Sequence, residues 1–215
     1  MTASLLVFLY LIYNAWFTNV TASVKTESLA EQIEKDFEAQ AISPLTISEP
    51  IRTAQVESVA VDAIGLVYIP RLKAQVWGLP LVQGIDPRSL SLGLGHYPST
   101  NLPGEAGNFA IAGHRATNGE PFAYFEKLQK GDSVFVRTAT NWFEYQLFED
   151  EIVQETETWV LEDNPRGLNL EAGTELITLT TCDPRWNSYQ RWAWWGKLIN
   201  TYPADQKPLE IAGGN

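Results

Sequence analysis

Cysteine is almost absent from this chain, since Cys182 is the only one among 215 residues. A single cysteine excludes an intramolecular disulfide, and it excludes the zinc and redox motifs that need two or more thiols. The two histidines leave little for a transition-metal site. Cys182 is therefore either a small buried hydrophobic residue or a reactive thiol.

Positive charge is also scarce, because 15 Lys and Arg residues stand against 26 Asp and Glu residues, which gives a formal net charge of −11. A polyanion would be repelled on average, and no basic run offsets this repulsion. We therefore expect no nucleic-acid partner.

Charged residues of either sign are missing from residues 1–24, most of which are apolar. At the rise of an α-helix, a segment of this length reaches roughly 36 Å, against a hydrocarbon core of about 30 Å. The segment therefore predicts a transmembrane anchor. A cleaved signal peptide is the alternative, because the small residues Thr21, Ala22 and Ser23 follow the apolar stretch.

Residues 25–58 have the pattern of a stalk followed by a linker. Leu29, Ile33 and Phe37 recur every four residues in a charged background, which predicts a short amphipathic helix. Three apolar residues make a thin stripe, so we expect a solvated stalk helix rather than a partner-binding one. Residues 41–58 contain two prolines and no clear period, which indicates a linker.

Residues 59–202 are expected to form one β-rich domain, followed by a C-terminal tail over residues 203–215. Short alternating runs, separated by glycine-containing turns, favour strands over a helical bundle. One helical turn is expected within Pro121–Asp132, where Phe122, Phe125 and Leu128 share a side. The predicted strands are Leu66–Ile69, Asn108–Ala112, Ser133–Thr138, Trp142–Phe148, Leu176–Thr181 and Trp192–Ile199.

Three residues stand at positions suited to chemistry. His114 and Cys182 follow or end apolar strand candidates, where a rigid support can display a side chain. Arg191 opens the next strand, and it returns to the neighbourhood of Cys182 if the two strands pair as a hairpin. A thiolate, an imidazolium and a guanidinium suit acyl transfer, because they can attack a carbonyl, protonate a leaving amine and stabilise an oxyanion.

Each of these residues also has a purely structural interpretation. A lone cysteine on a strand is usually packed, and a histidine in a turn can satisfy a loop carbonyl. Arg191 can equally be a surface residue, and Arg185, inside the turn, is the second candidate for the site's arginine.

The remaining polar and aromatic features are expected to serve structure. We expect His96 to order its loop, since a second imidazole is not needed for this chemistry. The acidic run Glu149–Glu151 is a possible calcium site, but the absence of EF-hand-like spacing favours a solvated turn. The tryptophans expected in the core and in a groove wall are Trp192, Trp194 and Trp195.

The ordered motifs resemble one family. AGHR contains His114, TLTTC ends at Cys182, and Arg191 begins the final aromatic strand. This set resembles the sortases, which are membrane-anchored cysteine transpeptidases of Gram-positive bacteria, and TLTTC fits their TLxTC signature. The resemblance covers roughly residues 60–202, and the segment ending in GHRATNGEPF looks most like the class E, housekeeping-type enzymes of actinobacteria.

The resemblance implies an eight-stranded sortase β-barrel with short helices, in which Cys182 is the nucleophile, His114 the general acid and base, and Arg191 the substrate and oxyanion ligand. It implies a single-pass membrane protein whose catalytic domain is extracellular. Such an enzyme cleaves an LPxTG- or LAxTG-like sorting motif of a surface protein after threonine and holds the acyl group as a thioester. The acceptor would be an amine of a peptidoglycan precursor or of a pilin, and no cofactor is implied.

One position departs from class E, and two other functions remain open. Class E relatives often carry an aromatic residue in the loop after the histidine, where this chain has Asn118, so their preference for alanine in the sorting motif is not carried over. A peptide hydrolase needs the same three residues and differs only in using water as the acceptor. A non-catalytic barrel that binds an extended peptide by strand addition is the more distant alternative.

Overall fold

The computed structural model describes residues 23–40, 52–56 and 59–213. The predicted membrane anchor and the alternative signal peptide fall in residues 1–24 and lie almost entirely outside these ranges. Within the described ranges, no helix is long and apolar enough to cross a bilayer.

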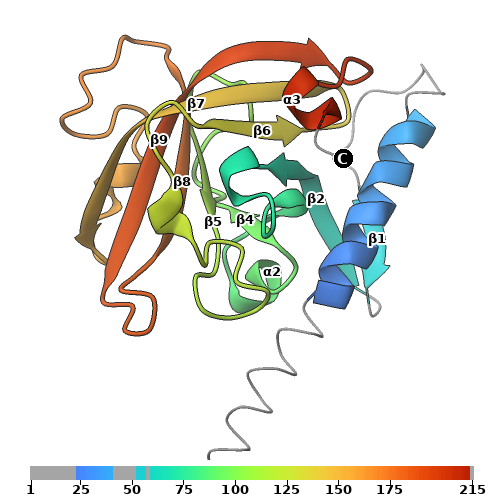
Figure 1. Ribbon diagram of the computed structural model, residues 1–215, viewed down its shortest axis with the longest axis horizontal. Coiled ribbons are helices and arrows are strands. Elements are labelled where there is room, and N and C mark those ends of the chain that lie inside the picture. The colour runs from blue at the N-terminus through green and yellow to red at the C-terminus, as the bar shows by residue number, and fades with distance from the viewer. Residues whose placement is uncertain (1–22, 41–51, 57–58, 214–215) are drawn as a thin grey trace, which may run out of the picture.

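The described residues contain a sheet of nine strands that closes on itself, in the order β1-β2-β3-β4-β5-β8-β9-β7-β6 (Figure 1). A further pairing, of β2 with β6, joins eight of the strands into a barrel and leaves β1 as an extension beside β2. The expected mostly-β, eight-stranded barrel is therefore confirmed. The strands are β1 (Arg52–Val56), β2 (Val59–Tyr68), β3 (Trp77–Gln83), β4 (Leu94–His96), β5 (Gly107–Ala112), β6 (Ser133–Arg137), β7 (Asn141–Gln154), β8 (Glu175–Asp183) and β9 (Gln190–Pro203).

Two strands of the barrel, β3 and β4, were not predicted, because glycine and proline interrupt their pattern. In β4 and just before it, Gly93 and Gly95 approach neighbouring backbone so closely that a Cβ would lie 2.3 Å from the carbonyl oxygens of Pro80 and Gly84, respectively. No other residue fits that spacing without a shift of the backbone. The two glycines therefore have opposite effects: they interrupt the sequence pattern of a strand, and they allow β4 to pair with its neighbours.

The barrel interior is filled by alternate residues of its strands. In β5 these are Phe109 and Ile111, and in β8 they are Ile177 and Leu179, all fully buried. The predicted helical turn is present as a 3-10 helix, η2, whose flanking apolar residues pack into the same cluster. The helical elements are α2 (Pro87–Leu90), α3 (Leu209–Ala212), η1 (Pro70–Leu72), η2 (Phe125–Lys127) and η3 (Thr158–Leu161), besides a helix over residues 23–40.

The helix over residues 23–40, called the N-terminal helix below, lies beside β1 and β2 (Figure 1). Its stripe of Leu29, Ile33 and Phe37 is only 0%, 1% and 3% exposed. These side chains share a cluster with residues on the outer face of the barrel, including Leu66 and Trp142. The expectation of a solvated stalk helix is therefore wrong, because the thin stripe matches an apolar strip on the barrel.

The chain on either side of the predicted domain is also more structured than expected. Residues 41–58 were predicted to be a linker, yet β1 lies within them and pairs antiparallel with β2. In the predicted C-terminal tail, Ile211 of α3 joins the cluster beneath the N-terminal helix. β1 thus extends the sheet beside β2, and α3 adds to the cluster on the outer face of the barrel.

Ile33→Ala should lower the free energy of unfolding by about 2–4 kcal/mol, because the side chain is buried and its removal leaves a cavity. Lys35→Ala, on the exposed side of the same helix, should change the free energy of unfolding by less than about 0.5 kcal/mol. Chemical denaturation of the full chain measures both. Equal effects of the two substitutions would mean that the helix does not pack against the barrel.

Candidate active site

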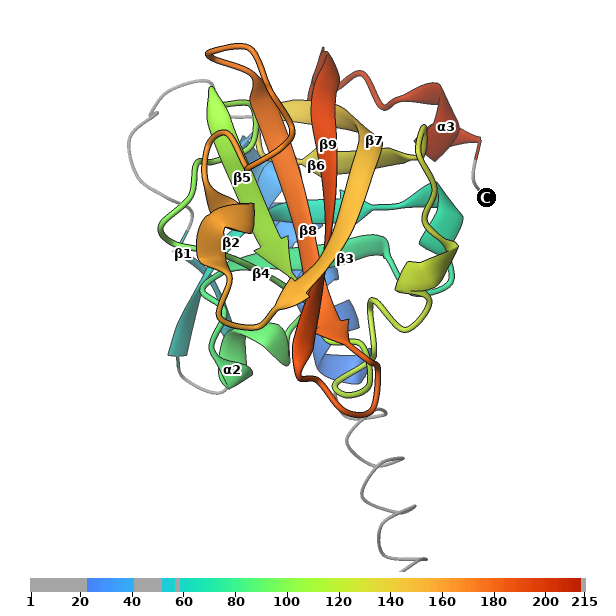
Figure 2. The ribbon, with the colours of Figure 1, turned by 90° about the vertical axis from the view of Figure 1, so that its left-hand side faces the viewer.

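The strands β5, β8 and β9 are neighbours in the sheet, and Figure 2 shows them side by side. Cys182 and Arg191 belong to β8 and β9, and His114 lies just beyond the end of β5. β5 and β8 are parallel, and their register pairs Ala112 with Thr180. His114 and Cys182 each lie two residues beyond this pair. β8 and β9 are antiparallel, and Cys182 is the direct partner of Arg191. The fold therefore brings all three residues to one region.

The site faces outward from the barrel. Leu179 belongs to the interior cluster and Trp192 packs against it. Because side chains alternate along a strand, Cys182 and Arg191 project from the opposite, outer face. Both are partly exposed, so a peptide in solution can reach them.

Hydrogen bonds continue beyond the β5–β8 ladder and hold His114 in place. The Gly113 N–H donates to the Thr180 carbonyl at 3.1 Å, and the Thr181 hydroxyl donates to the Gly113 carbonyl at 2.8 Å. The Phe122 N–H donates to the His114 carbonyl at 3.0 Å. Since Phe122 is fully buried in the core, it anchors the far end of the loop that begins at His114.

His114 has the electrostatics of a proton carrier. Burial lowers the pKa of its imidazole below the usual value of 6.5, so the neutral ring predominates at neutral pH. Its Nε2 atom is buried and has no hydrogen-bond partner within the part of the chain that the structure describes. No described residue therefore occupies that nitrogen.

Arg191 is held by the turn between β8 and β9. Its Nη1 donates to the carbonyls of Ser188 at 3.0 Å and Gln190 at 2.8 Å. Its Nη2 forms an ion pair with Glu155 at 3.3 Å. The guanidinium is therefore held at the turn that follows Cys182 and already carries the Glu155 carboxylate.

Arg115 is a residue of the site that the sequence reasoning missed. It is 8% exposed, and its Nη1 contacts both the Asp183 carboxylate and the Cys182 carbonyl, the latter at 3.3 Å. Its guanidinium also lies over the Trp192 ring, 5.2 Å from the centroid. Its position directly after His114 was the one feature of the sequence that could have indicated this role. An isolated arginine is usually interpreted as a surface residue, because the sequence does not show its partners.

Arg185, the second candidate for the site's arginine, has a different place. Its Nη2 forms an ion pair with Glu120, which belongs to the loop after His114. Its guanidinium also stacks over the Trp186 ring at 5.0 Å. The direct strand pairing with Cys182 belongs to Arg191, so Arg191 is the better candidate for a substrate ligand.

Tyr97 is a second residue that the sequence reasoning missed. It follows β4 directly, and its hydroxyl is 3.0 Å from the hydroxyl oxygen of Thr180. Burial raises the pKa of Tyr97, while the charge of Arg191 lowers it, so the phenol lies within electrostatic reach of that guanidinium. Tyr97 therefore borders the site on the side opposite β9.

His96 has the loop-ordering role expected of it. Its Nδ1 is 2.8 Å from the Gln83 side-chain oxygen, and its Nε2 is 2.9 Å from the Asn101 carbonyl. The ring is buried and stacks on Phe109. Both ring nitrogens are therefore engaged in structure, and the prediction is confirmed.

The three tryptophans of β9 serve packing, as expected, but in three different places. Trp194 lies in the barrel interior, and Trp195 belongs to an outer cluster where it stacks on Trp159 at 6.1 Å. Trp192 is partly buried, and its indole N–H donates to Asp150 at 2.8 Å. The outer cluster includes Leu176 of β8 and Ala193 and Trp195 of β9.

The acidic run Glu149–Glu151 lies inside strand β7, so the expectation of a turn is wrong. Glu149 pairs with Lys130 at 2.7 Å, and Asp150 accepts the Trp192 N–H. Within the described ranges, no group of three or more His, Cys, Asp or Glu residues could hold a metal ion. The run instead joins β7 to its neighbours.

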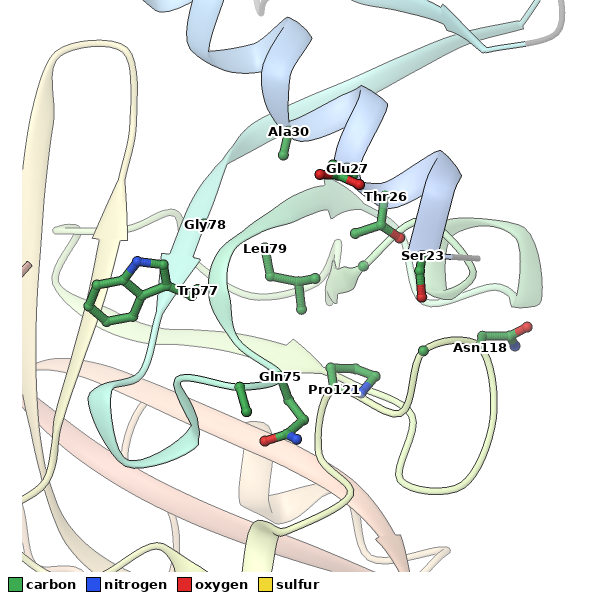
Figure 3. Close-up of a pocket in the computed structure, with 13 residues that line it drawn as sticks. Ser23, Thr26, Glu27, Ala30, Gln75, Trp77, Gly78, Leu79, Asn118 and Pro121 are labelled. Carbon is green, nitrogen blue, oxygen red and sulfur yellow. The ribbon is translucent and has the colours of Figure 1, made fainter. Parts of the chain in front are cut away.

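A cavity of about 370 Å³ lies between the N-terminal helix and the barrel (Figure 3). It is lined by Thr26 and Glu27 of the helix, by Trp77 of β3, and by Asn118 and Pro121 of the loop after His114. None of the three predicted catalytic residues is among the described residues that line it. This cavity is therefore lined by a different set of residues from the predicted catalytic site.

Comparison with known proteins identifies the family. Residues 67–199 match the sortase domain. Sortase SrtE1 of Streptomyces coelicolor is 32% identical over 210 residues, which cover 94% of this chain and 56% of SrtE1. Sortase SrtE2 of the same organism is 29% identical over 214 residues, which cover 95% of this chain and 81% of SrtE2. The chain thus spans little more than half the length of the first of these relatives.

Solved structures give the same answer. Sortase E of Streptomyces avermitilis has a TM-score of 0.63 and 37% identity, with 69% of this chain and 96% of that chain covered. Sortase E1 of S. coelicolor with a tripeptide in its active site has a TM-score of 0.64 and 34% identity, with the same coverage. The likeness to class E found in the sequence is confirmed, and the chain belongs to the sortase family.

Proposed function

We propose that this protein is a cysteine transpeptidase that cleaves an LPxTG- or LAxTG-like sorting motif after threonine and joins the acyl group to an amine. The observation that supports it most is the alignment of His114, Cys182 and Arg191 across β5, β8 and β9 of a sortase barrel. A peptide substrate is further supported by the tripeptide in the active site of the similar S. coelicolor sortase E1.

The first half of the reaction forms a thioester. The Cys182 thiolate attacks the carbonyl carbon of the threonine, and the resulting oxyanion is stabilised by the Arg191 guanidinium. The C–N bond then breaks, and the His114 imidazolium gives its proton to the leaving amine. The acyl group remains on sulfur and His114 is left neutral.

The second half transfers the acyl group. An incoming amine loses a proton to the neutral His114 imidazole and attacks the thioester carbonyl. The C–S bond breaks, which restores the Cys182 thiolate and the His114 imidazolium. Water in place of the amine gives hydrolysis, so dependence of the product on an added amine separates the transferase from a hydrolase.

Arg191 has to change partners for this role. Its bonds to the turn carbonyls can remain, because they use Nη1, whereas Nη2 is paired with the exposed Glu155. An exposed ion pair contributes little free energy, about 0–1 kcal/mol. A substrate carbonyl can therefore displace Glu155 at low cost.

The choice of sorting motif depends in part on the loop after His114. Asn118 has a φ of 51° and is followed by Gly119 at 78°, so the loop turns through left-handed backbone. Asparagine tolerates this conformation better than most residues, which accounts for Asn118 at this position. Both LPxTG- and LAxTG-like motifs are therefore candidate substrates.

Residues 1–24 would anchor the enzyme in the cell membrane as a single span, with the catalytic domain outside. Their uncharged, apolar composition supports this, since it is long enough for the hydrocarbon core. The acceptor would then be an amine of a peptidoglycan precursor or of a surface protein such as a pilin. The net charge of −11 makes nucleic acid an unsuitable partner.

The full chain in detergent, incubated with LPxTG- and LAxTG-like peptides, should gain the mass of an acyl adduct on Cys182. Cys182→Ala should gain none, and His114→Ala should slow adduct formation about 100- to 10,000-fold, because proton transfer to the leaving amine is lost. Intact-mass spectrometry measures the adduct, and glycine or a diaminopimelate-type amine should convert it to product. Peptide binding without any adduct would favour the non-catalytic binding barrel.

Activity should have a bell-shaped pH dependence. Free cysteine and histidine, with pKa values of about 8.5 and 6.5, would give roughly 1% of the thiolate–imidazolium pair. Since burial lowers the pKa of His114, the acidic limb of the profile should lie below pH 6.5. Rates of adduct formation from pH 5 to 10 provide the measurement, and a flat profile would contradict the ion-pair mechanism.

A further inference from the structure

We propose that two ion pairs form a clasp that holds the loop after His114 against the end of β8. The clasp consists of Arg115 with Asp183 and of Arg185 with Glu120. Arg115 and Arg185 then act as positioning residues, which set the place of His114 relative to Cys182. This inference rests on the proposed transpeptidase function of the same site.

The two pairs run in opposite directions between the same two segments. The loop after His114 supplies Arg115 and Glu120, while the segment after Cys182 supplies Asp183 and Arg185. Each segment thus carries one cation and one anion, so the loop and the turn are each held at two points. Two points of attachment fix the orientation of the loop relative to the turn, whereas a single point would allow the loop to rotate about it.

The first pair is buried and lies next to the reacting residues. Arg115 directly follows His114, and Asp183 directly follows Cys182. The guanidinium also donates to the Cys182 carbonyl at 3.3 Å and to Glu126 at 3.2 Å. Loss of Arg115 would leave the largely buried Asp183 carboxylate without its guanidinium partner, so this pair resists opening.

The second pair is partly exposed. The side chains of Arg185 and Glu120 are 28% and 23% exposed, and the guanidinium stacks on Trp186. The pair closes the other side of the loop, where Asn118 and Glu120 both have positive φ. Its exposure makes it weaker than the first pair, but also open to charge reversal without collapse of the core.

The clasp is needed because backbone pairing ends too early. The β5–β8 register stops at Ala112 and Thr180, and the last backbone bond between the two segments joins Gly113 to Thr180. Beyond this point, side chains make the links between His114 and Cys182. A misplacement of about 1 Å can cost a large part of a rate, so these links bear directly on proton transfer.

Charge reversal of the exposed pair tests the proposal. Glu120→Arg and Arg185→Glu should each slow adduct formation by about threefold or more, because like charges then push the loop from the turn. The double variant Glu120→Arg/Arg185→Glu restores an ion pair of opposite direction and should return to within about twofold of the original rate. The effect should fall on the adduct-forming rate and not on the KM for the peptide.

The matched control is the pair of Arg71 and Asp132, which is also partly exposed and joins η1 to the turn before β6. Arg71→Glu should leave adduct formation unchanged. Thermal unfolding of every variant shows that the barrel is intact. Arg115→Lys keeps the buried charge but loses the forked geometry, and it should be slower than the original chain at equal folded fraction.

A measurement without peptide separates this proposal from the proposed function. Cys182 is the only cysteine, so its alkylation by iodoacetamide in the full chain reports one thiol. The pH profile of alkylation should change in Glu120→Arg and in Arg185→Glu and return in the double variant. If no peptide gives an adduct, the proposed function fails while this profile still decides the clasp.

Two results would overturn the clasp. Single variants with the same rate and pH profile as Arg71→Glu would show that the exposed pair has no part in positioning. A folded double variant as slow as the single variants would show that pairing of the two charges is not the cause. Recovery in the double variant, together with a slow Arg115→Lys, supports it.

Discussion

The site depends on the parallel pairing of β5 with β8. Six residue pairs, from Gly107 with Glu175 to Ala112 with Thr180, join segments that are far apart in the sequence. This ladder determines how far along the barrel axis His114 and Cys182 lie, and on which face of the sheet they project. The antiparallel β8–β9 pairing then adds Arg191 opposite the thiol. A shift by one residue in either ladder would turn one member of the site into the core.

Much of this arrangement can be predicted from the sequence, because the positions of several strands depend on local residue patterns. Alternation in β7 and the apolar runs of β5 and β8 place the strands, and their ends identify His114 and Cys182 as displayed residues. Arg191 follows from the short return between two strands. What pattern alone does not give is which strands become neighbours, and here the likeness to a known family supplied the barrel.

The parts that were not predicted depend on contacts between distant residues. A stripe of three apolar residues does not reveal that Leu66, Trp142 and Ile211 will cover it. Arg115 reads as a surface residue until the fold brings Asp183 and Trp192 to it. In both cases the residue is buried by a surface that is distant in the sequence, so the local sequence does not reveal the burial.

Strand order has a consequence for how the chain reaches its folded state. β9 lies between β7 and β8 and is the last of the described strands along the sequence, and β5 pairs with β8, which directly precedes β9. Long-range pairings of this kind form slowly and leave apolar strand faces uncovered in the meantime. A chain synthesised from its amino end therefore cannot close its barrel until β9 is available. Cys182 and Arg191 can therefore come to lie opposite each other only after β9 has been synthesised.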